Sequence, residues 1–529
     1  MSNKKLNIWL PLLFSITTVF GMIIGFQMRD AMPSRKFFST EKHSTLQEIT
    51  DILNSRYVDT INIKNLTDTA IQAILSKLDP HSLFIPAKEL QQINDEIKGS
   101  FLGIGIEFNI IDDSLNVIHV VKNGPAEKAG LLTGDIIIKA EDSIMVGKNL
   151  SFENVRLILR GSQKNKINLS IIRQNKLLKL AVERGIIPIP SLDAYYMLDS
   201  TTGYIKLNKF SSETYKEFMN ALLSLKKLNL QNLILDLRGN GGGVLEEAIE
   251  IADEFLAGDK LITYTEGLHH PKKEYRCRRE GQFEKGKVII LADEGSASAS
   301  EVLMGALQDW DRATIIGRRS FGKGLVQEQY DLSDHSALRL TVARYYTPIG
   351  RSIQRSYKNG NKSYYDDITN RYNDGEMQTA DSVKNDTTKI YKSQAGKKLF
   401  GGGGITPDFF VAVDTAKWSN TMHKIYTNGV LNKYGYKYCK QNTTSLTSYK
   451  TIKNFIKGFV VSENDWKYFE NLAIKDSIDI SKLSKPEKAF LLSQLKSVIA
   501  NQLYNTQGYF ETLNENDLMI KKATDVIKK

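Results

Sequence analysis

The chain of 529 residues has few of the side chains on which metal and redox sites depend. It contains only two cysteines, Cys277 and Cys439, which lie far apart and form no CxxC pair. Its seven histidines form no HExxH pattern. These absences argue against a thioredoxin-like motif, a zinc site and a metallopeptidase, and no metal or other cofactor is expected. A disulfide between the two cysteines stays open, because sequence alone does not give their distance.

The chain also lacks a concentration of charge of one sign. Its formal net charge is +11, yet acidic and basic residues are interleaved, and there is no long basic arm and no recognisable nucleic-acid module. Nucleic acid is therefore not an expected partner. The hydrophobic content of 41% is sufficient for ordinary cores, and the length favours several domains.

One long uncharged run stands near the N-terminus, over residues 8–28. It approaches the roughly 20 residues that cross a bilayer as a helix. Lys4 and Lys5 precede it, which favours an N-in orientation and a periplasmic or other extracytoplasmic location for the rest of the chain. The alternative is a cleaved signal peptide, which would leave a secreted or periplasmic protein. The length of the run and the lack of an A-x-A site favour an uncleaved membrane anchor.

Residues 99–185 have the pattern of a small β-rich module. A glycine-containing turn at 103–106 is followed by strands at 116–121, 136–138 and 167–172 and by helices starting near 124 and 152. This order, and above all the segment GPAEKAGLLTGD, resembles a PDZ domain. The resemblance implies that a protein C-terminus adds as an edge strand, with its carboxylate held by backbone N–H groups of Ile104, Gly105 and Ile106. The alternative is a PDZ fold that only packs against its neighbour.

From 186 to 412 strands and helices alternate, which predicts an α/β core. The expected strands lie at 203–207, 233–238, 288–291, 314–317, 325–330 and 338–346, and the expected helices at 214–225, 245–256 and 299–308. Residues 351–400 are polar and tyrosine-rich and are predicted to be an exposed insertion. Helical segments are expected before the PDZ-like module, over 31–98, and after the core, over 413–529, where no motif can be interpreted.

Three glycine patterns resemble nucleotide-binding loops, and each fails at one point. In GNGGGV (239–244) the third glycine of GxGxxG would be Val244. In GRRSFGKG (317–324) the Ser/Thr that a P-loop needs is Gly324, and a strand rather than a helix is predicted to follow. The run at 401–404 precedes no helix. Nucleotide binding is therefore not expected.

The most informative residues are Ser298, in GSASASE (295–301), and Lys323, in SFGKG (320–324). A serine hydroxyl becomes a good nucleophile when a base removes its proton, and a lysine can be that base if burial makes it neutral near pH 7. The two contexts closely resemble the active site of the C-terminal processing peptidases, the tail-specific, PDZ-containing Ser/Lys proteases of family S41. The segment LDPHS at 78–82 resembles the part of those proteins that precedes the PDZ domain.

The resemblance implies a role for each matching residue. It selects Ser298 as nucleophile over its neighbours Ser296 and Ser300, and Lys323 as the base. Gln327 matches the third catalytic residue of the family. It lies four residues after the lysine, so that in a strand or a helix it can share the lysine's face and orient the amine.

The oxyanion hole that the resemblance implies uses backbone N–H groups of Gly242 and Ala299, although Gly241 or Gly243 could take the place of Gly242. Asp309 matches an acidic position of the family and is predicted to have a structural role. A histidine-based triad is the rival serine mechanism, and its candidates are His269, His270 and His335.

The sequence therefore predicts a multi-domain α/β protein whose core is of the ClpP/crotonase-like type, preceded by a PDZ domain. The expected function is that of a membrane-anchored serine endopeptidase that cleaves exported proteins recognised through their C-terminal tails. The competing hypothesis is a non-catalytic, membrane-tethered PDZ adaptor that binds protein C-termini. The expected domains are 1–30 (anchor or signal), 31–98 (helical), 99–185 (PDZ), 186–412 (peptidase core) and 413–529 (helical extension).

Overall fold

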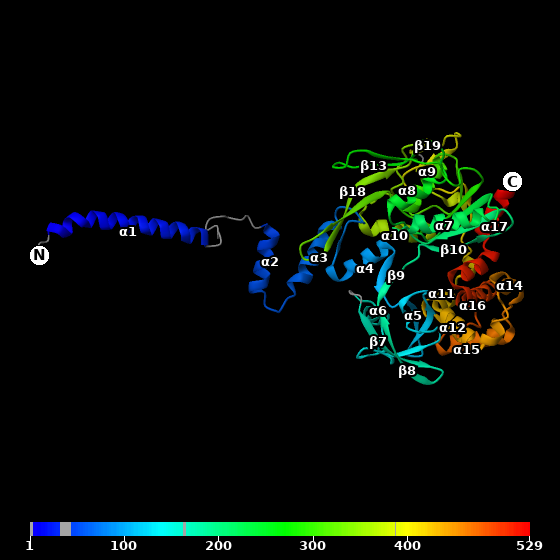
Figure 1. Ribbon diagram of the computed structural model, residues 1–529. Helices are drawn as coiled ribbons and strands as arrows, with labels where there is room; N and C mark the ends of the chain where they lie inside the picture. The colour runs from blue at the N-terminus through cyan, green and yellow to red at the C-terminus, as the bar shows by residue number, and fades with distance from the viewer. Residues whose placement is uncertain (1–3, 32–43, 162–164, 387) are drawn as a thin grey trace. The chain divides into compact units, whose positions relative to one another are not determined.

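The computed structural model describes residues 4–31, 44–161, 165–386 and 388–529. The chain divides into two compact units, Met1–Ile71 and Gln72–Lys529 (Figure 1). The first unit contains α1 (Lys4–Ala31), α2 (Thr45–Arg56) and most of α3 (Ile63–Leu75). Within the described ranges, no helix has both the length and the apolar character that crossing a bilayer requires. The structure thus gives no support to the predicted anchor over 8–28.

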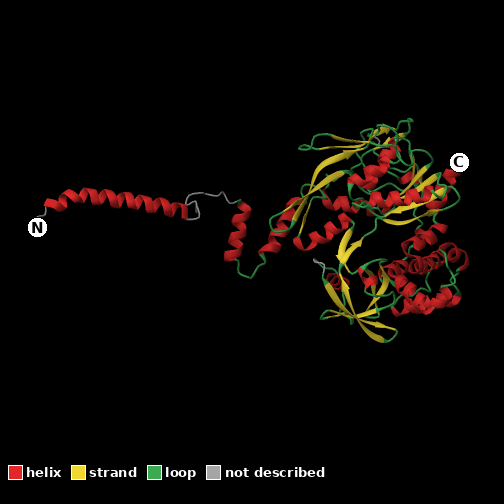
Figure 2. Cartoon of the chain, in the orientation of Figure 1, coloured by secondary structure: helices red, strands yellow, loops and turns green. Residues whose placement is uncertain are grey.

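The second unit contains both helices and strands (Figure 2). At its centre is a six-stranded sheet with the order β10-β11-β12-β15-β16-β21. β10 is antiparallel to β11, and every other neighbouring pair is parallel. The sequence-based expectation of an α/β core is confirmed. The strands are β10 (Leu192–Met197), β11 (Thr202–Leu207), β12 (Asn232–Asp236), β15 (Val288–Ala292), β16 (Ala313–Gly317) and β21 (Phe409–Phe410).

Alternating side chains of this sheet pack on two different sets of helices. One face joins the largest hydrophobic cluster with α7, α8 and α9, and the other face is covered by α17. Since parallel strands end at the same edge, the loops after β12, β15 and β16 come together there, and ligand sites of such sheets lie at that edge. The helices are α7 (Thr214–Lys226), α8 (Leu245–Asp253), α9 (Ala299–Asp309) and α17 (Leu518–Lys528).

A second, antiparallel sheet has the order β1-β18-β13-β14, with β17 also paired to β18. The hairpin of β17 and β18 follows the loop that contains Lys323 and includes Gln327, opposite Thr341. This sheet therefore supplies the strand that supports the lysine. Its strands are β1 (Leu83–Ile85), β13 (Leu261–Glu266), β14 (Lys273–Arg276), β17 (Leu325–Asp331) and β18 (Ala337–Tyr346).

The segment 351–400 packs on the loop of residues 318–324, although its composition predicts an exposed insertion. Its helix α10 (Gly360–Asn373) buries Tyr364 and Arg371. Arg371 donates hydrogen bonds to the carbonyl oxygens of Ser320, at 3.0 Å, and Arg319, at 2.6 Å. The polar side chains of this helix thus bind backbone groups of the neighbouring loop. The segment also contains the short strands β19 (Ile390–Lys392) and β20 (Lys398–Phe400).

The PDZ-like module is an antiparallel sheet of order β3-β4-β5-β7-β8, with β6 beside β5. The predicted helix over 152–159 is confirmed as α6, and β2 and β9 pair where the chain enters and leaves the module. α4 (Ala87–Lys98) precedes it. Its elements are β2 (Ser100–Gly103), β3 (Ile106–Ile111), β4 (Ser114–Val120), α5 (Pro125–Lys128), β5 (Ile136–Ala140), β6 (Ser143–Ile144), α6 (Phe152–Leu159), β7 (Lys166–Arg173), β8 (Lys176–Glu183) and β9 (Gly185–Pro188).

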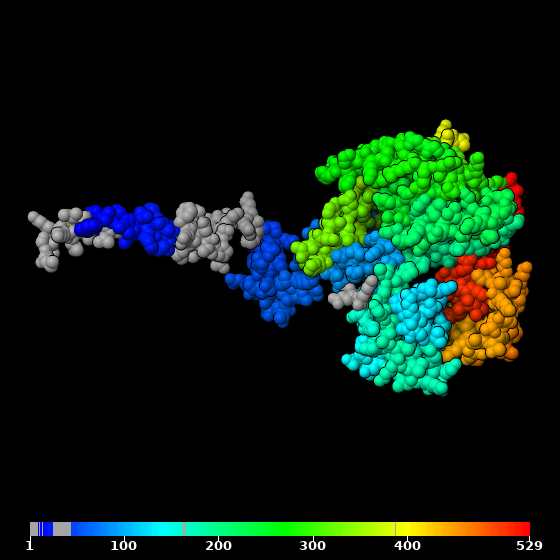
Figure 3. All heavy atoms as spheres, viewed as in Figure 1, coloured from blue at the N-terminus to red at the C-terminus, as the bar shows by residue number. Residues whose placement is uncertain are grey.

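The C-terminal helices have a hydrophobic core of their own and contact both the module and the central sheet (Figure 3). Tyr436 donates to Asn116 Oδ1 of β4 at 3.1 Å, and Asp517 pairs with Arg238 at 2.6 Å. α16 is kinked at Tyr504 and Asn505, whose backbone angles are not helical. The helices are α11 (Asn420–Thr427), α12 (Val430–Gln441), α13 (Thr443–Leu446), α14 (Ile452–Gly458), α15 (Glu463–Lys475) and α16 (Lys485–Leu513).

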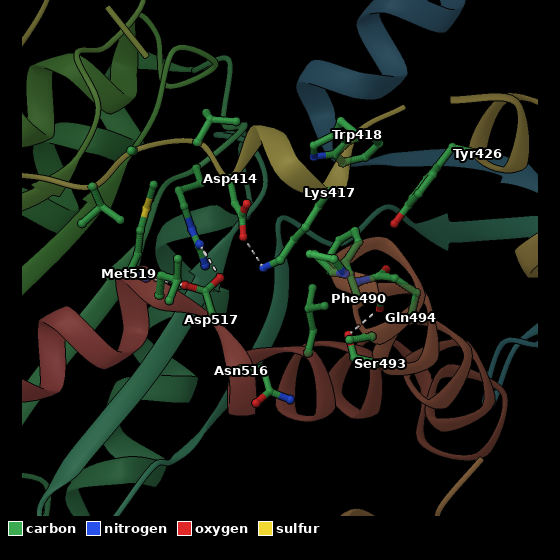
Figure 4. A pocket seen from close by; sticks show the side chains of 18 of the residues that line it. Asp414, Lys417, Trp418, Tyr426, Phe490, Ser493, Gln494, Asn516, Asp517 and Met519 are labelled. Carbon is green, nitrogen blue, oxygen red and sulfur yellow. Dashed lines mark hydrogen bonds and ion pairs between the residues drawn. The ribbon is translucent and has the colours of Figure 1, made fainter. Parts of the chain in front are cut away.

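A cavity of about 700 Å³ separates part of these helices from the central sheet (Figure 4). Its wall combines aromatic side chains, among them Trp418 and Phe490, with charged groups that are already paired. Lys417 pairs with Asp414 at 2.9 Å. Because Arg238 directly precedes the glycine run at 239–243, this wall continues into one of the loops at the sheet edge.

Candidate active site

Ser298 occupies the sharp turn between β15 and α9. It is the N-cap residue of α9 and has φ 55° and ψ −115°, a backbone conformation that is strained for a residue with a Cβ atom. Its N–H donates to Glu301 Oε2 at 2.8 Å. The side chain is half-buried. Small residues on both sides of the serine leave room for a peptide backbone to approach its hydroxyl.

The two neighbouring serines differ from Ser298 in burial and in bonding. Ser296 and Ser300 are fully buried. Ser296 Oγ donates to the carbonyl oxygen of Leu237 at 2.8 Å, and Ser300 Oγ donates to that of Asn240 at 2.9 Å. These hydroxyls therefore hold the serine turn to the glycine loop, while Ser298 alone of the three is not fully buried.

Lys323 lies in the loop that joins β16 to β17. Its Nζ donates to Gln327 Oε1 at 3.0 Å. Burial lowers the pKa of Lys323 below its usual value, and the charge of Arg339 lowers it further. A lysine whose pKa is lowered in this way is a better base at neutral pH, because more of it is uncharged.

A buried carboxylate, Glu301, connects the serine turn to the lysine loop. Besides the Ser298 N–H, it accepts the N–H groups of Lys323, at 2.8 Å, and Gly322, at 2.7 Å, and the Ser320 hydroxyl at 2.5 Å. Burial raises the pKa of Glu301 to about 7. No role was predicted for Glu301, although the pattern Ser-x-x-Glu at the start of a helix is the signature of a capping box and could have indicated one.

Tyr345 of β18 also bonds to both the serine turn and the lysine loop. Its hydroxyl donates to the carbonyl oxygens of Ser298, at 3.1 Å, and of Lys323. The tyrosine is buried, and burial raises its pKa, so the hydroxyl remains a donor at neutral pH. The turn and the loop are therefore held together by one acceptor group, Glu301, and one donor group, Tyr345.

The glycine loop after β12 lies against the serine turn. A Cβ atom on Gly242 would come within 2.8 Å of Ser298 Cβ and 2.9 Å of the Ala299 nitrogen, so only glycine fits there. The Gly242 N–H donates to Asn240 Oδ1 at 2.9 Å. The Ala299 N–H, in the first turn of α9, has no acceptor among the described residues, nor have those of Gly241 and Gly243. The choice among the three glycines as oxyanion donor stays a prediction.

The predicted carboxylate loop of the PDZ module uses its carbonyl oxygens in backbone hydrogen bonds. The carbonyl oxygens of Ile104 and Gly105 accept the N–H groups of Ala126, at 2.8 Å, and Val121, at 3.0 Å. The N–H groups of Ile104 and Gly105 have no acceptor in the described part of the chain. Ile106 begins β3, which is an edge strand of its sheet. A peptide could therefore add beside β3.

Two aromatic rings bridge the space beside this edge strand. Phe108 of β3 stacks on Phe152 of α6 with the ring centroids 5.1 Å apart. The two rings therefore connect the edge strand to α6. Sequence periodicity places both residues in their elements, but it gives no sign that they touch.

The remaining residues that the sequence singled out are three histidines, Asp309 and the two cysteines. His269 and His335 are exposed, and His270 lies 3.7 Å from Glu328. Asp309 forms a buried ion pair with Arg351 at 2.5 Å, in keeping with a structural role. Cys277 and Cys439 are both free thiols. No group of three or more metal-binding side chains gathers in the ranges that the structure describes.

Three family profiles match parts of this chain. The profile of peptidase family S41 matches residues 201–360, and a PDZ domain profile matches residues 103–183. Residues 421–505 match a family of unknown function, DUF8443. The first match covers β11, β12, β15 and β16 of the central sheet with the loops after them, and the second covers the β-rich module.

Similar proteins carry names that describe C-terminal processing. A carboxy-terminal-processing protease of Bartonella bacilliformis is 35% identical over 313 residues, which are 58% of this chain and 71% of that protein. The protease CtpB of Bacillus subtilis is 32% identical over 333 residues, 61% of this chain and 69% of that protein. Among solved structures, the photosystem II D1 C-terminal processing protease is 25% identical, with a TM-score of 0.35 and coverage of 72% and 88%. The chain therefore belongs to the C-terminal processing serine proteases of peptidase family S41.

Proposed function

We propose that this protease cleaves exported proteins, which it recognises by their C-terminal tails, with Ser298 as nucleophile, Lys323 as base and Gln327 as the residue that orients the lysine. The observation that carries the proposal is that one buried carboxylate links a half-buried serine on a strained turn to a lysine whose pKa is lowered by burial. Glu301 joins the backbones of the two residues. The Lys323 amine in turn donates to the Gln327 amide oxygen at 3.0 Å.

The proposed reaction has two stages. Neutral Lys323 takes the proton of the Ser298 hydroxyl while Oγ attacks the scissile carbonyl carbon, and the ammonium then gives that proton to the leaving amine. Water next attacks the acyl carbon and loses a proton to Lys323. The ammonium then gives this proton to Ser298 Oγ as the bond between Oγ and the acyl carbon breaks and the acid product leaves. The negative charge on the substrate oxygen is stabilised in both stages by the Ala299 N–H and by one donor of the glycine loop.

The choice of glycine donor has a structural consequence. If Gly242 is the donor, its N–H must exchange Asn240 Oδ1 for the substrate oxygen when substrate binds. If Gly241 or Gly243 is the donor, no bond has to be broken. Gly242 lies closest to the serine turn, since its position meets both Ser298 and Ala299. Its N–H therefore remains the first candidate.

Tail recognition gives one testable prediction. An amidated peptide lacks the charge that the loop around Gly105 is predicted to bind, and a charged hydrogen bond is worth roughly 1.5–3 kcal/mol. We expect the full-length enzyme to cleave a free-acid peptide roughly tenfold to a hundredfold more efficiently than its amide, measured as kcat/KM. Ser298→Ala is the control and should cleave neither peptide. Equal cleavage of both peptides would leave the enzyme a peptidase but not a reader of C-termini, whereas binding without any cleavage would favour the adaptor.

We also propose, from the sequence alone, that the protease domains lie on the extracytoplasmic side of the membrane. The support is the uncharged run over 8–28 and the lysines before it. A reporter that is active only in the cytoplasm, fused after residue 60, should show no activity, while a periplasmic reporter at the same point should be active. The opposite pattern would refute this topology.

A further inference from the structure

The amide of Gln327 is held on both of its ends. Its oxygen accepts from Lys323 Nζ, and its nitrogen donates to the carbonyl oxygen of His81. Because a carbonyl oxygen can only accept a hydrogen bond, the NH2 end of the amide must face His81, and the oxygen must then face the lysine. The orientation of Gln327 is thus decided by a loop that precedes the PDZ module in the sequence.

The loop of residues 79–82 is held by several hydrogen bonds. The buried carboxylate of Asp79 accepts the N–H groups of His81 and Ser82, both at 2.8 Å, and the Ser82 hydroxyl at 2.5 Å. It also accepts the Thr341 hydroxyl of β18 at 3.0 Å. Thr341 is paired with Gln327 across the β17–β18 hairpin. The loop is therefore attached to the same hairpin that holds the glutamine.

Two tyrosines of helix α10 also bond to the loop. The Tyr364 hydroxyl bonds to His81 Nε2 at 2.8 Å, and the Tyr365 hydroxyl donates to the carbonyl oxygen of Pro80 at 2.5 Å. Burial lowers the pKa of His81 to about 4, so the imidazole is neutral at pH 7 and the bond to Tyr364 involves no net charge. Tyr364 is itself fully buried and stacks on Arg355.

We propose that the loop of residues 79–82, clamped by Tyr364 and Tyr365 of α10, is a positioning element of the active site that fixes the amide of Gln327 and, through it, the amine of Lys323. This role rests on the proposed Ser/Lys chemistry. The LDPHS segment and α10 thereby gain a function. Their residues are positioning residues, since none of them touches the reacting atoms.

We expect the pKa of Lys323 to fall when this positioning is lost. An oxygen that faces the amine stabilises the charged ammonium more than the neutral form, so losing a correctly oriented Gln327 lowers the pKa of Lys323 further. One lost hydrogen bond corresponds to about half a pH unit to one pH unit. The titratable and charged groups that surround the lysine and remain unchanged are Glu301 of α9, Arg339 and Tyr345 of β18, and Asp79 and His81 of the loop.

The test measures the titration of Lys323 directly in the full-length protein. Short pulses of acetic anhydride at a series of pH values, followed by mass spectrometry of the peptide that contains Lys323, give its midpoint without any need for turnover. The variants are Tyr364→Phe, Tyr365→Phe, Gln327→Ala and the double variant Tyr364→Phe with Gln327→Ala. Tyr372→Phe is the matched control, because this tyrosine is exposed on the same helix.

We expect Gln327→Ala and Tyr364→Phe to shift the midpoint to lower pH, with the larger shift in Gln327→Ala, and the double variant to match Gln327→Ala alone. Tyr365→Phe should act in the same direction, and Tyr372→Phe should match the wild type. The inference is overturned if neither tyrosine variant moves the midpoint, or if Tyr364→Phe moves it equally with and without Gln327.

Turnover of a tailed peptide by the same samples separates this inference from the proposed function. If the wild type cleaves the peptide, Tyr364→Phe should reduce kcat about threefold to tenfold and leave KM unchanged, since only the base is displaced. If the wild type does not cleave, or if Ser298→Ala still cleaves, the proposed function fails. The labelling results then still decide whether the loop and α10 position the lysine.

Discussion

Lys323→Arg is expected to abolish peptide hydrolysis as completely as Ser298→Ala does, by at least about a thousandfold in kcat/KM. A guanidinium group keeps its proton at any pH at which the protein is folded, so it cannot accept the proton of Ser298. Lys323→Ala should be equally inactive. Activity is measured with a free-acid tailed peptide, and Lys358→Arg is the matched control, because Lys358 is exposed in a nearby segment.

The pH dependence of the wild type follows from the same assignment. The active form of Lys323 is the neutral amine, and burial lowers its pKa below the usual value for lysine. The kcat/KM value should therefore rise with pH through this lowered pKa and reach its plateau on the alkaline side. Substantial turnover by Lys323→Arg would contradict the assignment. If His81→Gln then removed that turnover, His81 would become the candidate base.

Glu301→Gln is expected to reduce kcat/KM by about a hundredfold, although Glu301 does not touch the substrate in the proposed reaction. The carboxylate accepts three backbone N–H groups and one hydroxyl, from Ser298, Ser320, Gly322 and Lys323. A glutamine side chain has a single oxygen, so its NH2 group must face some of these donors, which leaves buried groups unpaired at about 1–3 kcal/mol each. Glu246→Gln, at the exposed start of α8, is the control.

The stability of the wild type should also change with pH, because Glu301 gains or loses a proton. Burial raises its pKa to about 7, above the value in an unfolded chain, so the folded state binds the proton more tightly. The resulting stabilisation is fully present below the unfolded pKa and is lost as pH rises toward 7. We therefore expect the difference in Tm between wild type and Glu301→Gln to shrink between pH 5 and pH 8. A constant difference would contradict the raised pKa.

Local patterns in the sequence predict much of this fold. Runs of apolar residues indicate the strands of the central sheet, and the helix over 152–159 is found with its bounds. The convergence of the loops around Gly242, Ser298 and Lys323 follows from parallel pairing, because strands of one direction end at one edge. These features depend on neighbours in the sequence or on a general rule of sheet geometry.

Other parts of the site depend on contacts between distant segments, which no local pattern reveals. Tyr364 and Arg371 are in a polar stretch that indicates exposure, yet they are buried because the lysine loop and the loop of His81 present polar partners to them. No neighbour of His81 in the sequence indicates a partner for its side chain. Its partners, Tyr364 and Gln327, come from segments that are remote in the sequence.

The packing of α17 on the central sheet means that the last helix of the chain covers strands that are synthesised much earlier. Its residues Met519, Ile520 and Ala523 cover an apolar face of strands made much earlier, and Lys287 bonds to Ile527 across a separation of 240 residues. Until α17 has emerged from the ribosome, that face remains uncovered and Arg238 lacks Asp517 beside the glycine loop. We therefore expect this face of the sheet to be covered, and the ion pair of Arg238 with Asp517 to form, only after α17 has been synthesised.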